Sequence, residues 1–253
     1  MSGNTHAKPA DIVSIMGVPF SKMTFEETIH HIAKIAEAPN EGVYHIVTAN
    51  PEVVMAAKKD EHLMNVLQDA SLITPDGIGI VLASRWKGDP VPERVAGYDM
   101  LIKLLETGND RNWSFYFLGT DEETSRTAVQ TIASRYPNLR IAGRHNGFFS
   151  AEEEPRIVEE IRLAAPDFLI VAMGAAAAAK WIDRHISRLN AKVAFGVGGS
   201  LDVIAGKVQR APLIWQKLNL EWLHRLLKQP SRWRRQLVLP VFAFQAFFRR
   251  NRL

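Results

Sequence analysis

Short hydrophobic runs alternate with longer amphipathic stretches along most of the chain. These runs are too short for helices and rich in β-branched or aromatic residues, which is typical of buried strands. Strands that alternate with helices build right-handed βαβ units and a parallel sheet. The pattern therefore predicts an α/β protein with a mostly parallel, Rossmann-like sheet flanked by helices. The expected strands span residues 43–47, 113–118, 139–143, 168–173 and 192–197.

Several stretches carry signals for the start of a helix. Thr24 and Glu27 stand at the spacing of a capping box, as do Ser150 and Glu153, so each pair is expected to open a helix. The chain before the first of these helices reads as a strand, a turn and a short partner strand over residues 11–22. Other helical segments are expected after Pro51, over 78–86, 98–105 and 176–189, and between Thr120 and Pro137.

Two polar turns in the first half of the chain carry candidate chemistry. Thr48 and Asn50 directly follow the expected strand 43–47, and Asn50 stands at an N-cap position with proline at the first helical position. The end of a strand beside the free N–H groups of a helix N-terminus suits a polar or anionic ligand. Asp76, in the turn 75–77, is a candidate general base. Asn-Pro and Pro-Asp-Gly are also common turn sequences, so each residue could equally have only a structural role.

A glycine-rich turn follows the last expected strand and opens a helix. Its residues Gly196, Val197, Gly198 and Gly199 would let backbone N–H groups approach phosphate oxygens. The spacing matches neither GxGxxG nor a Walker A motif, so neither nicotinamide nor ATP is indicated as a ligand. A tight strand-to-helix turn explains the glycines equally well. Asp202, just beyond, could accept hydrogen bonds from a ribose or base, or only place a negative charge at the helix N-terminus.

The composition narrows the classes of site. The chain has no cysteine, which excludes disulfides, thiol catalysis and cysteine metal sites and agrees with a reducing cytoplasm. Its eight histidines form no HExxH or comparable cluster, so we expect no metal site. The first residues lack a basic region followed by an apolar run, so we expect no signal peptide.

Charge divides the chain into a body and a tail. Residues 209–253 carry ten lysines and arginines against one acid, Glu221, a net charge of +9, whereas the remainder carries a net charge of −5. We therefore expect an α/β core over 1–208, with an N-terminal lobe over about 1–110 and a Rossmann-like lobe over about 111–208, and an appendage over 209–253. An acidic body with a basic tail indicates an anionic partner for the tail.

The tail combines this charge with aromatic and aliphatic residues. Trp215, Leu218, Trp222 and Leu226 lie at helical spacing on one stripe. The apolar run 237–248, interrupted by a proline and a glutamine, is shorter than the roughly 20 residues that span a bilayer. Basic amphipathic helices with Trp and Phe suit the plane of an anionic membrane surface instead.

The composition of the tail is compatible with three other roles. Basic and aromatic residues also bind single-stranded nucleic acid, but an apolar block this dense does not fit a nucleic-acid groove, so we expect no nucleic-acid partner. A helical appendage packed on the core with a solvated basic face is the structural alternative. An exposed apolar tail can also drive homo-oligomer formation in solution.

A set of motifs in a fixed order resembles the WecG/TagA/CpsF glycosyltransferases. They are TANPEVV, TPDGIGIV, PERVAGYD, the LGT after a strand, NGFF, GVGGSLDVIAGKVQRAP and EWLHRLLKQPSRWRR. Each motif by itself is weak, but the set is specific, and it runs from about Ile12 to Arg235. The basic tail makes the chain more similar to the TagA branch than to any other.

The resemblance implies an inverting hexosyltransferase of bacterial cell wall biogenesis. Such an enzyme moves N-acetylmannosamine from UDP-ManNAc to the 4-hydroxyl of the GlcNAc on undecaprenyl diphosphate, in synthesis of the wall teichoic acid linkage unit. The resemblance also implies no metal or other cofactor, and a peripheral position on the cytoplasmic face of the plasma membrane. Within the family, UDP-ManNAcA or UDP-glucose is the alternative donor, for another surface polysaccharide. Outside it, the alternative is a non-catalytic nucleotide-binding module with a nucleic-acid-binding tail.

The same resemblance assigns roles to residues of this chain. Asp76 is implied to be the general base, and the loop 196–199 with Asp202 the UDP site. The groups implied to hold the sugar and the diphosphate are Thr48, Asn50 and Arg94. The tail groups implied to contact the lipid diphosphate are Arg225, Arg232 and Arg235.

One stretch departs from the family pattern. After Gly174 the chain has five consecutive alanines, where the family usually has G-x-P-x-Q-E-x-W. Alignment on Gly174 and Trp181 places Ala178 at the glutamine, which is expected to contact the donor sugar. A methyl group cannot replace an amide's hydrogen bonds, and loss of an oriented transition-state contact costs about 100-fold in rate. We therefore expect this chain to be impaired relative to one with glutamine at 178, as in an engineered or divergent inactive copy.

Overall fold

The computed structural model describes residues 9–228 and 233–248 of the chain. A six-stranded parallel sheet forms its centre, in the order β4-β3-β8-β7-β5-β6. This confirms the predicted α/β fold. The strands are β3 (Tyr44–Ala49), β4 (Leu72–Pro75), β5 (Ser114–Gly119), β6 (Arg140–His145), β7 (Phe168–Ala172) and β8 (Val193–Gly196).

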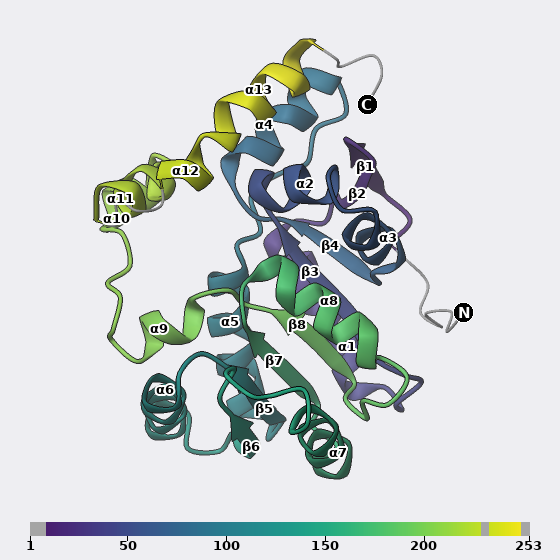
Figure 1. Ribbon diagram of the computed structural model, residues 1–253, viewed down its shortest axis with the longest axis vertical. Coiled ribbons are helices and arrows are strands. Elements are labelled where there is room, and N and C mark those ends of the chain that lie inside the picture. The colour runs from purple at the N-terminus through teal and green to yellow at the C-terminus, as the bar shows by residue number, and fades with distance from the viewer. Residues whose placement is uncertain (1–8, 229–232, 249–253) are drawn as a thin grey trace.

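Helices cover both faces of the sheet (Figure 1). Consecutive residues of a strand point to opposite faces, so Ile46 joins one hydrophobic core and Val47 another. Burial on both faces explains why the strands read as continuous apolar runs. One layer contains α1 (Phe25–Glu37), α5 (Gly97–Arg111) and α6 (Glu122–Arg135). The other contains α2 (Pro51–Ala57), α3 (Glu61–Asp69), α4 (Ile78–Lys87), α7 (Glu154–Ala164) and α8 (Ala175–His185).

The local signals at the start of the chain are confirmed. Residues 11–22 contain an antiparallel hairpin of β1 (Ile12–Ile15) and β2 (Val18–Ser21). Thr24 and Glu27 form both hydrogen bonds of a capping box at the start of α1. The Ser150 and Glu153 bonds also form, at 2.9 and 3.3 Å, but they close a turn over 151–153. α7 begins only at Glu154 with Glu153 as its N-cap, so the prediction that this pair opens the helix was wrong.

Three expected helical segments differ in extent. The segment expected over 176–189 ends as α8 at His185 and is followed by a turn over 186–188. The stretch after Pro51 is two helices, because Asp60 interrupts it and caps α3 by accepting a hydrogen bond of 3.0 Å from the Leu63 N–H. α5 continues past its expected end to Arg111. Gly108 supports this extension, since a Cβ there would lie 2.8 Å from the ring of Phe115. Helix and sheet thus approach closely at that point.

The expected stripe in the tail is interrupted. Residues 213–228 form two helices, α10 (Leu213–Lys217) and α11 (Glu221–Lys228), rather than one. Asn219 lies between them with φ of +59°, in the left-handed region that asparagine tolerates better than most residues. The prediction of one continuous stripe through Trp215, Leu218, Trp222 and Leu226 was therefore wrong.

After α12 (Trp233–Gln236), α13 (Val238–Phe248) crosses over α4 and α2 (Figure 1). Pro240 interrupts the apolar run in the sequence but not the helix, because it lies in the first helical turn, where its missing N–H is not needed. Phe242 is buried, and Phe247 meets the ring of Trp86 edge-on at 5.7 Å. Within residues 9–228 and 233–248 we find no helix long and apolar enough to cross a membrane.

The expected division into lobes stays a prediction. Strands from both sides of the boundary near residue 110 share one sheet, since β8 lies between β3 and β7. This shared sheet brings loops from distant parts of the chain to one edge.

Candidate active site at the carboxyl edge of the sheet

The ends of β3, β4 and β8 lie side by side and carry most of the candidate residues. Thr48 pairs in register with Thr74, and the Asp76 N–H donates a hydrogen bond of 3.0 Å to the carbonyl of Ala49. Neighbouring parallel strands end at the same edge, where ligands of open α/β sheets bind. The structure therefore brings Asp76 next to the turn that follows Thr48.

Thr48 connects this turn to the glycine loop, residues 196–199. Its hydroxyl donates a hydrogen bond of 3.2 Å to the carbonyl of Gly196, and the residue is 6% exposed. A Cβ at Gly97 would lie only 3.0 Å from the Thr48 hydroxyl oxygen, so the first turn of α5 covers Thr48 closely. Thr48 is thus held between the glycine loop and the start of α5.

Asn50 is the N-cap of α2, as predicted. Its side-chain oxygen accepts a hydrogen bond of 3.0 Å from the Val53 N–H. The Asp76 turn lies beside it, since a Cβ at Gly77 would be 3.8 Å from the Asn50 Cβ. Gly77 has φ of +116°, which strongly favours glycine. The cap occupies the oxygen of Asn50, so the NH₂ group is the half of its amide suited to a ligand.

Arg94 lies beside Asp76 because the residue after it donates a backbone hydrogen bond of 3.0 Å to the carbonyl of Pro75. Its Nη1 lies 2.5 Å from a carboxylate oxygen of Glu221, in the tail, and its Nη2 lies 3.7 Å from Asp99. Burial alone would lower the pKa of Arg94, but the hydrogen bond to Glu221 and the charges of Asp76 and Asp99 raise it above its usual value. Arg94 is therefore a partly buried, permanent cation.

The glycine loop is a compact turn. Gly198 has φ of +53°, in the region that favours glycine, and the Ser200 hydroxyl closes the turn with a hydrogen bond of 2.6 Å to the carbonyl of Val197. The short helix α9 (Ser200–Ile204) follows. The expected strand-to-helix geometry is therefore present.

Asp202 faces the loop after β5. Its carboxylate accepts a hydrogen bond of 3.2 Å from the hydroxyl of Thr120, and a Cβ at Gly199 would lie 3.3 Å from its other oxygen. Thr120 was not among the predicted site residues, although it stands in the LGT motif at a strand end. Its position after an aromatic strand was the signal that could have found it.

Ala178 lies behind the glycine loop. It is fully buried in α8, and a Cβ at Gly196 would lie 2.8 Å from the Ala178 Cβ. Position 178 therefore packs directly against the end of β8, whereas the preceding Ala177 is exposed. The impairment expected from alanine at 178 stays a prediction.

The predictions on the three tail arginines remain open. Arg232 lies outside the described residues. The backbones of Arg225 and Arg235 belong to α11 and α12, but their side chains lie outside what the structure describes. In the described part of the chain, no three histidine, aspartate or glutamate side chains gather closely enough to hold a metal ion.

The fold and these residues define an α/β protein with a carboxylate, a guanidinium and a glycine-rich turn on the carboxyl edge of its sheet. Residues 13–253 match the model of the family described as "Glycosyl transferase WecG/TagA/CpsF family". The chain belongs to this family of glycosyltransferases, so the resemblance seen in its motifs is confirmed.

Two relatives carry the same name, N-acetylglucosaminyldiphosphoundecaprenol N-acetyl-beta-D-mannosaminyltransferase. The one from Bacillus subtilis (strain 168) is 37% identical over 198 residues, which cover 78% of this chain and 77% of that protein. The one from Staphylococcus aureus (strain MRSA252) is 34% identical over 233 residues, which cover 92% and 91%. The similarity to the Staphylococcus aureus protein therefore extends over nearly the full length of both chains, and the similarity to the Bacillus subtilis protein over the larger part of each.

Proposed function

We propose that this chain is a hexosyltransferase that moves N-acetylmannosamine from UDP-ManNAc to N-acetylglucosaminyldiphosphoundecaprenol, in synthesis of the wall teichoic acid linkage unit. The proposal depends chiefly on one observation: Asp76 lies next to Arg94 and next to the turn that follows Thr48. The hydroxyl of Thr48 in turn bonds to the glycine loop. The relatives named for this reaction support the choice of donor sugar and acceptor.

The proposed reaction is a single displacement with inversion. The Asp76 carboxylate takes the proton from the acceptor's 4-hydroxyl, whose oxygen attacks the anomeric carbon of the donor sugar. The bond from that carbon to the diphosphate breaks, and UDP departs with the electron pair. Arg94 stabilises the departing negative charge, because its planar fork can pair two phosphate oxygens.

The remaining edge residues are assigned to binding. Thr48 and Asn50 orient the sugar and diphosphate at the start of α2. The N–H groups of the glycine loop contact the diphosphate, and Asp202 accepts a hydrogen bond from the ribose or base. Arg225, Arg232 and Arg235 are proposed to meet the lipid diphosphate of the acceptor.

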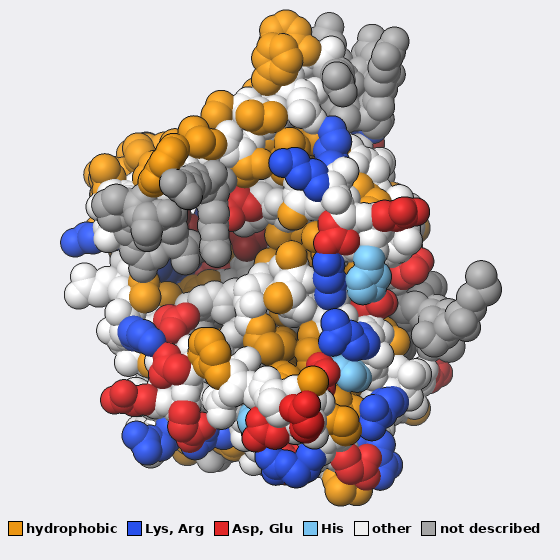
Figure 2. Space-filling view, in the orientation of Figure 1, with side chains coloured by type: hydrophobic (Ala, Val, Ile, Leu, Met, Phe, Trp, Pro, Cys, Tyr) orange, Lys and Arg blue, Asp and Glu red, His pale blue; other side chains and the backbone are white. Residues whose placement is uncertain are grey.

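We further propose that the protein acts as a peripheral protein on the cytoplasmic face of the plasma membrane, where such an acceptor is embedded. Val241, Phe244 and Phe248 are exposed along α13, and Trp233 and Leu237 are exposed before it. Figure 2 shows hydrophobic side chains along the upper ridge of the molecule, where α12 and α13 lie in Figure 1. With the basic charge of the tail, this ridge suits an anionic membrane surface.

The decisive experiment is a transfer assay with the full chain, UDP-ManNAc and a synthetic lipid-linked GlcNAc acceptor. We expect a disaccharide-lipid product by mass spectrometry and a loss of about 100-fold or more in Asp76→Asn, the scale of a general base. Asp110→Asn, at an exposed position of α5, is the matched control and should retain the rate.

Other outcomes would redirect the proposal. Product from UDP-ManNAcA or UDP-glucose, but not from UDP-ManNAc, would assign the alternative donor. Near-normal transfer by Asp76→Asn would exclude this residue as the base. Salt-sensitive binding of single-stranded nucleic acid without any sugar transfer would favour the non-catalytic alternative.

A further inference from the structure

Four charged side chains form a ring between the body and the tail. Glu221 of α11 lies 2.5 Å from Arg94 and 3.4 Å from Arg210, measured between their closest nitrogen and oxygen atoms. Asp99, in the first turn of α5, lies 2.7 Å from Arg210 and 3.7 Å from Arg94. Each carboxylate therefore sits between both guanidinium groups, and the charges alternate around the ring.

The ring is shielded from solvent more than an ordinary surface ion pair. The side chains of Glu221, Arg94, Arg210 and Asp99 are 12%, 19%, 24% and 35% exposed, whereas both partners of the pair Arg162–Glu159 on α7 are 47% exposed. The guanidinium of Arg210 also stacks over the ring of Tyr98, 4.6 Å from its centroid. Salt screens partly buried pairs less, and arginine forks hold a defined geometry, so this ring can orient what it joins.

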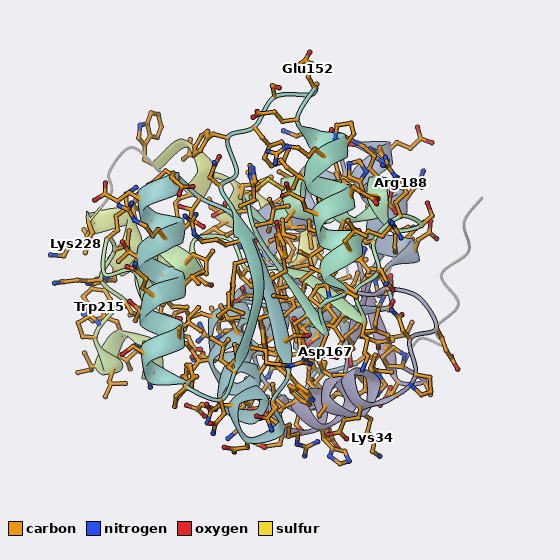
Figure 3. The ribbon with its side chains drawn as sticks, turned by 90° about the horizontal axis from the view of Figure 1, so that it is seen from below. Lys34, Glu152, Asp167, Arg188, Trp215 and Lys228 are labelled. Atoms are coloured by element: carbon orange, nitrogen blue, oxygen red, sulfur yellow. The ribbon has the colours of Figure 1, made fainter. Side chains whose placement is uncertain are left out.

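The apolar residues around the same part of the tail are divided between half-buried positions, such as Leu223 and Leu226, and exposed ones. The large apolar residues exposed on and near α10 and α11 include Leu213, Ile214, Leu218, Trp222 and Leu227. Figure 3 shows Trp215 and Lys228, from these two helices, on one flank of the molecule, opposite Arg188. The ring is thus a well-defined polar attachment of α11 to the body.

We propose that Glu221 is a positioning residue, which docks α11 onto the turn of Arg94 and aims the Arg94 guanidinium beside Asp76. Glu221 holds Nη1 and Asp99 faces Nη2, so the rotation of the guanidinium is set before any ligand arrives. Arg225 follows Glu221 by one helical turn, so the same docking sets where its backbone lies. The catalytic consequence rests on the proposed function of Arg94; the docking itself does not.

The opposite role for Glu221 makes a different prediction. If Glu221 merely occupied Arg94 as a competing anion, removal of its charge would release the guanidinium and increase turnover. If the contact were an ordinary surface pair, its removal would change nothing measurable. A positioning role predicts that loss of the charge undocks α11 and decreases turnover.

Docking can be measured with spin labels, because the chain has no natural cysteine. Labels at Glu106→Cys on α5 and Leu227→Cys on α11 report the distance between body and tail by pulsed electron paramagnetic resonance. We expect a narrow distribution with Glu221 present, a broader one in Glu221→Gln, and the broadest in Glu221→Lys, which repels both arginines. The controls Glu159→Gln and Glu159→Lys, which break the exposed pair on α7, should keep the narrow distribution.

A second label pair, Glu106→Cys with Arg188→Cys, lies wholly within the body and verifies that each variant keeps its fold. If Glu221→Lys disturbs this pair, the isosteric Glu221→Gln decides the test. A narrow body-to-tail distribution in folded Glu221→Gln and Glu221→Lys would overturn the docking.

Kinetics then test the consequence for the reaction. We expect kcat/KM for the lipid acceptor to fall about tenfold in Glu221→Gln, the scale of a lost hydrogen bond between charged groups, with both Glu159 variants unaffected. Unchanged or faster turnover by an undocked variant would overturn the positioning role. Absence of turnover in every chain, the unsubstituted one included, would count against the proposed function, and the label distances would still decide the docking.

Discussion

The hydroxyl of Thr48 bonds to the carbonyl of Gly196 at 3.2 Å, across 148 residues of sequence. This contact joins the end of β3 to the end of β8 and closes the edge on which Asn50, Asp76 and the glycine loop meet. A small change at Thr48 should therefore affect both stability and the binding of a nucleotide.

Thr48→Val keeps the shape of the side chain but removes the donor. We expect the free energy of unfolding to fall by about 1–3 kcal/mol, because the buried Gly196 carbonyl loses a partner. UDP should also bind more weakly, as measured by calorimetry. Thr48→Ser, which keeps the hydroxyl donor, should retain the stability and the UDP affinity of the parent chain. Thr131→Val is the control, since the Thr131 hydroxyl bonds to the Thr127 carbonyl at 2.9 Å on an exposed face of α6. Equal stability and UDP affinity in Thr48→Val and the parent chain would contradict the role of this bond.

Ala178→Gln should increase the rate of transfer. The added amide would supply an oriented contact to the donor sugar, which we expect to increase turnover by about 100-fold. Because Ala178 is fully buried against Gly196, the larger side chain should also cost about 1–3 kcal/mol of stability. Turnover of UDP-ManNAc and urea unfolding test the two effects separately. Ala177→Gln, at the exposed neighbouring position, should change neither, and equal rates for Ala178→Gln and the parent chain would refute the prediction.

The buried imidazole of His45 should make the protein less stable in mild acid. It is fully buried in β3, and burial lowers the pKa of its imidazole from 6.5 to about 4. Between these values the unfolded chain binds a proton that the folded chain does not. The folded state is therefore not penalised by His45 above about pH 6.5. As the pH falls from there toward 4, the free energy of unfolding should decrease by about 3 kcal/mol.

Urea unfolding from pH 7 to pH 4 measures this loss. The chain with His45→Leu should lose less stability over this range than the parent chain. The variant His62→Leu, at an exposed histidine, should show the same dependence of unfolding free energy on pH as the parent chain. Subtracting the His45→Leu curve from the parent curve removes the contributions of all other groups. Parallel curves for His45→Leu and the parent would rule out the burial effect.

The exposed face of α13 predicts attachment to lipid. The full chain should sediment with phosphatidylglycerol vesicles at low salt, and deletion of residues 209–253 should abolish this. Phe244→Glu combined with Phe248→Glu should reduce binding strongly, because it places acids on the exposed face of α13. Leu163→Glu, on α7, removes an equally exposed apolar residue outside the tail and should bind normally. A parent chain that stays in the supernatant would contradict the membrane proposal.

The sequence by itself determined the local elements and the chemistry at their ends. Alternating apolar runs and caps predicted the parallel sheet, the N-cap at Asn50 and the turn that presents Asp76. These features depend on neighbours within a few residues, where side-chain spacing and backbone preference act directly. The basic tail was likewise visible, because charge is a property of composition.

Tertiary structure decided which of these local features meet. The placement of β8 beside β3, which creates the Thr48–Gly196 bond, depends on the packing of the whole sheet. The ion pair between Arg94 and Glu221 joins residues that lie 127 positions apart in the chain, and no local pattern marks Glu221 as a member of this ring. The break at Asn219 and the burial of Ala178 behind the glycine loop depend in the same way on distant partners. Contacts between segments far apart in sequence are chosen by the packing of the complete fold, whereas turns and caps are specified by the residues that form them.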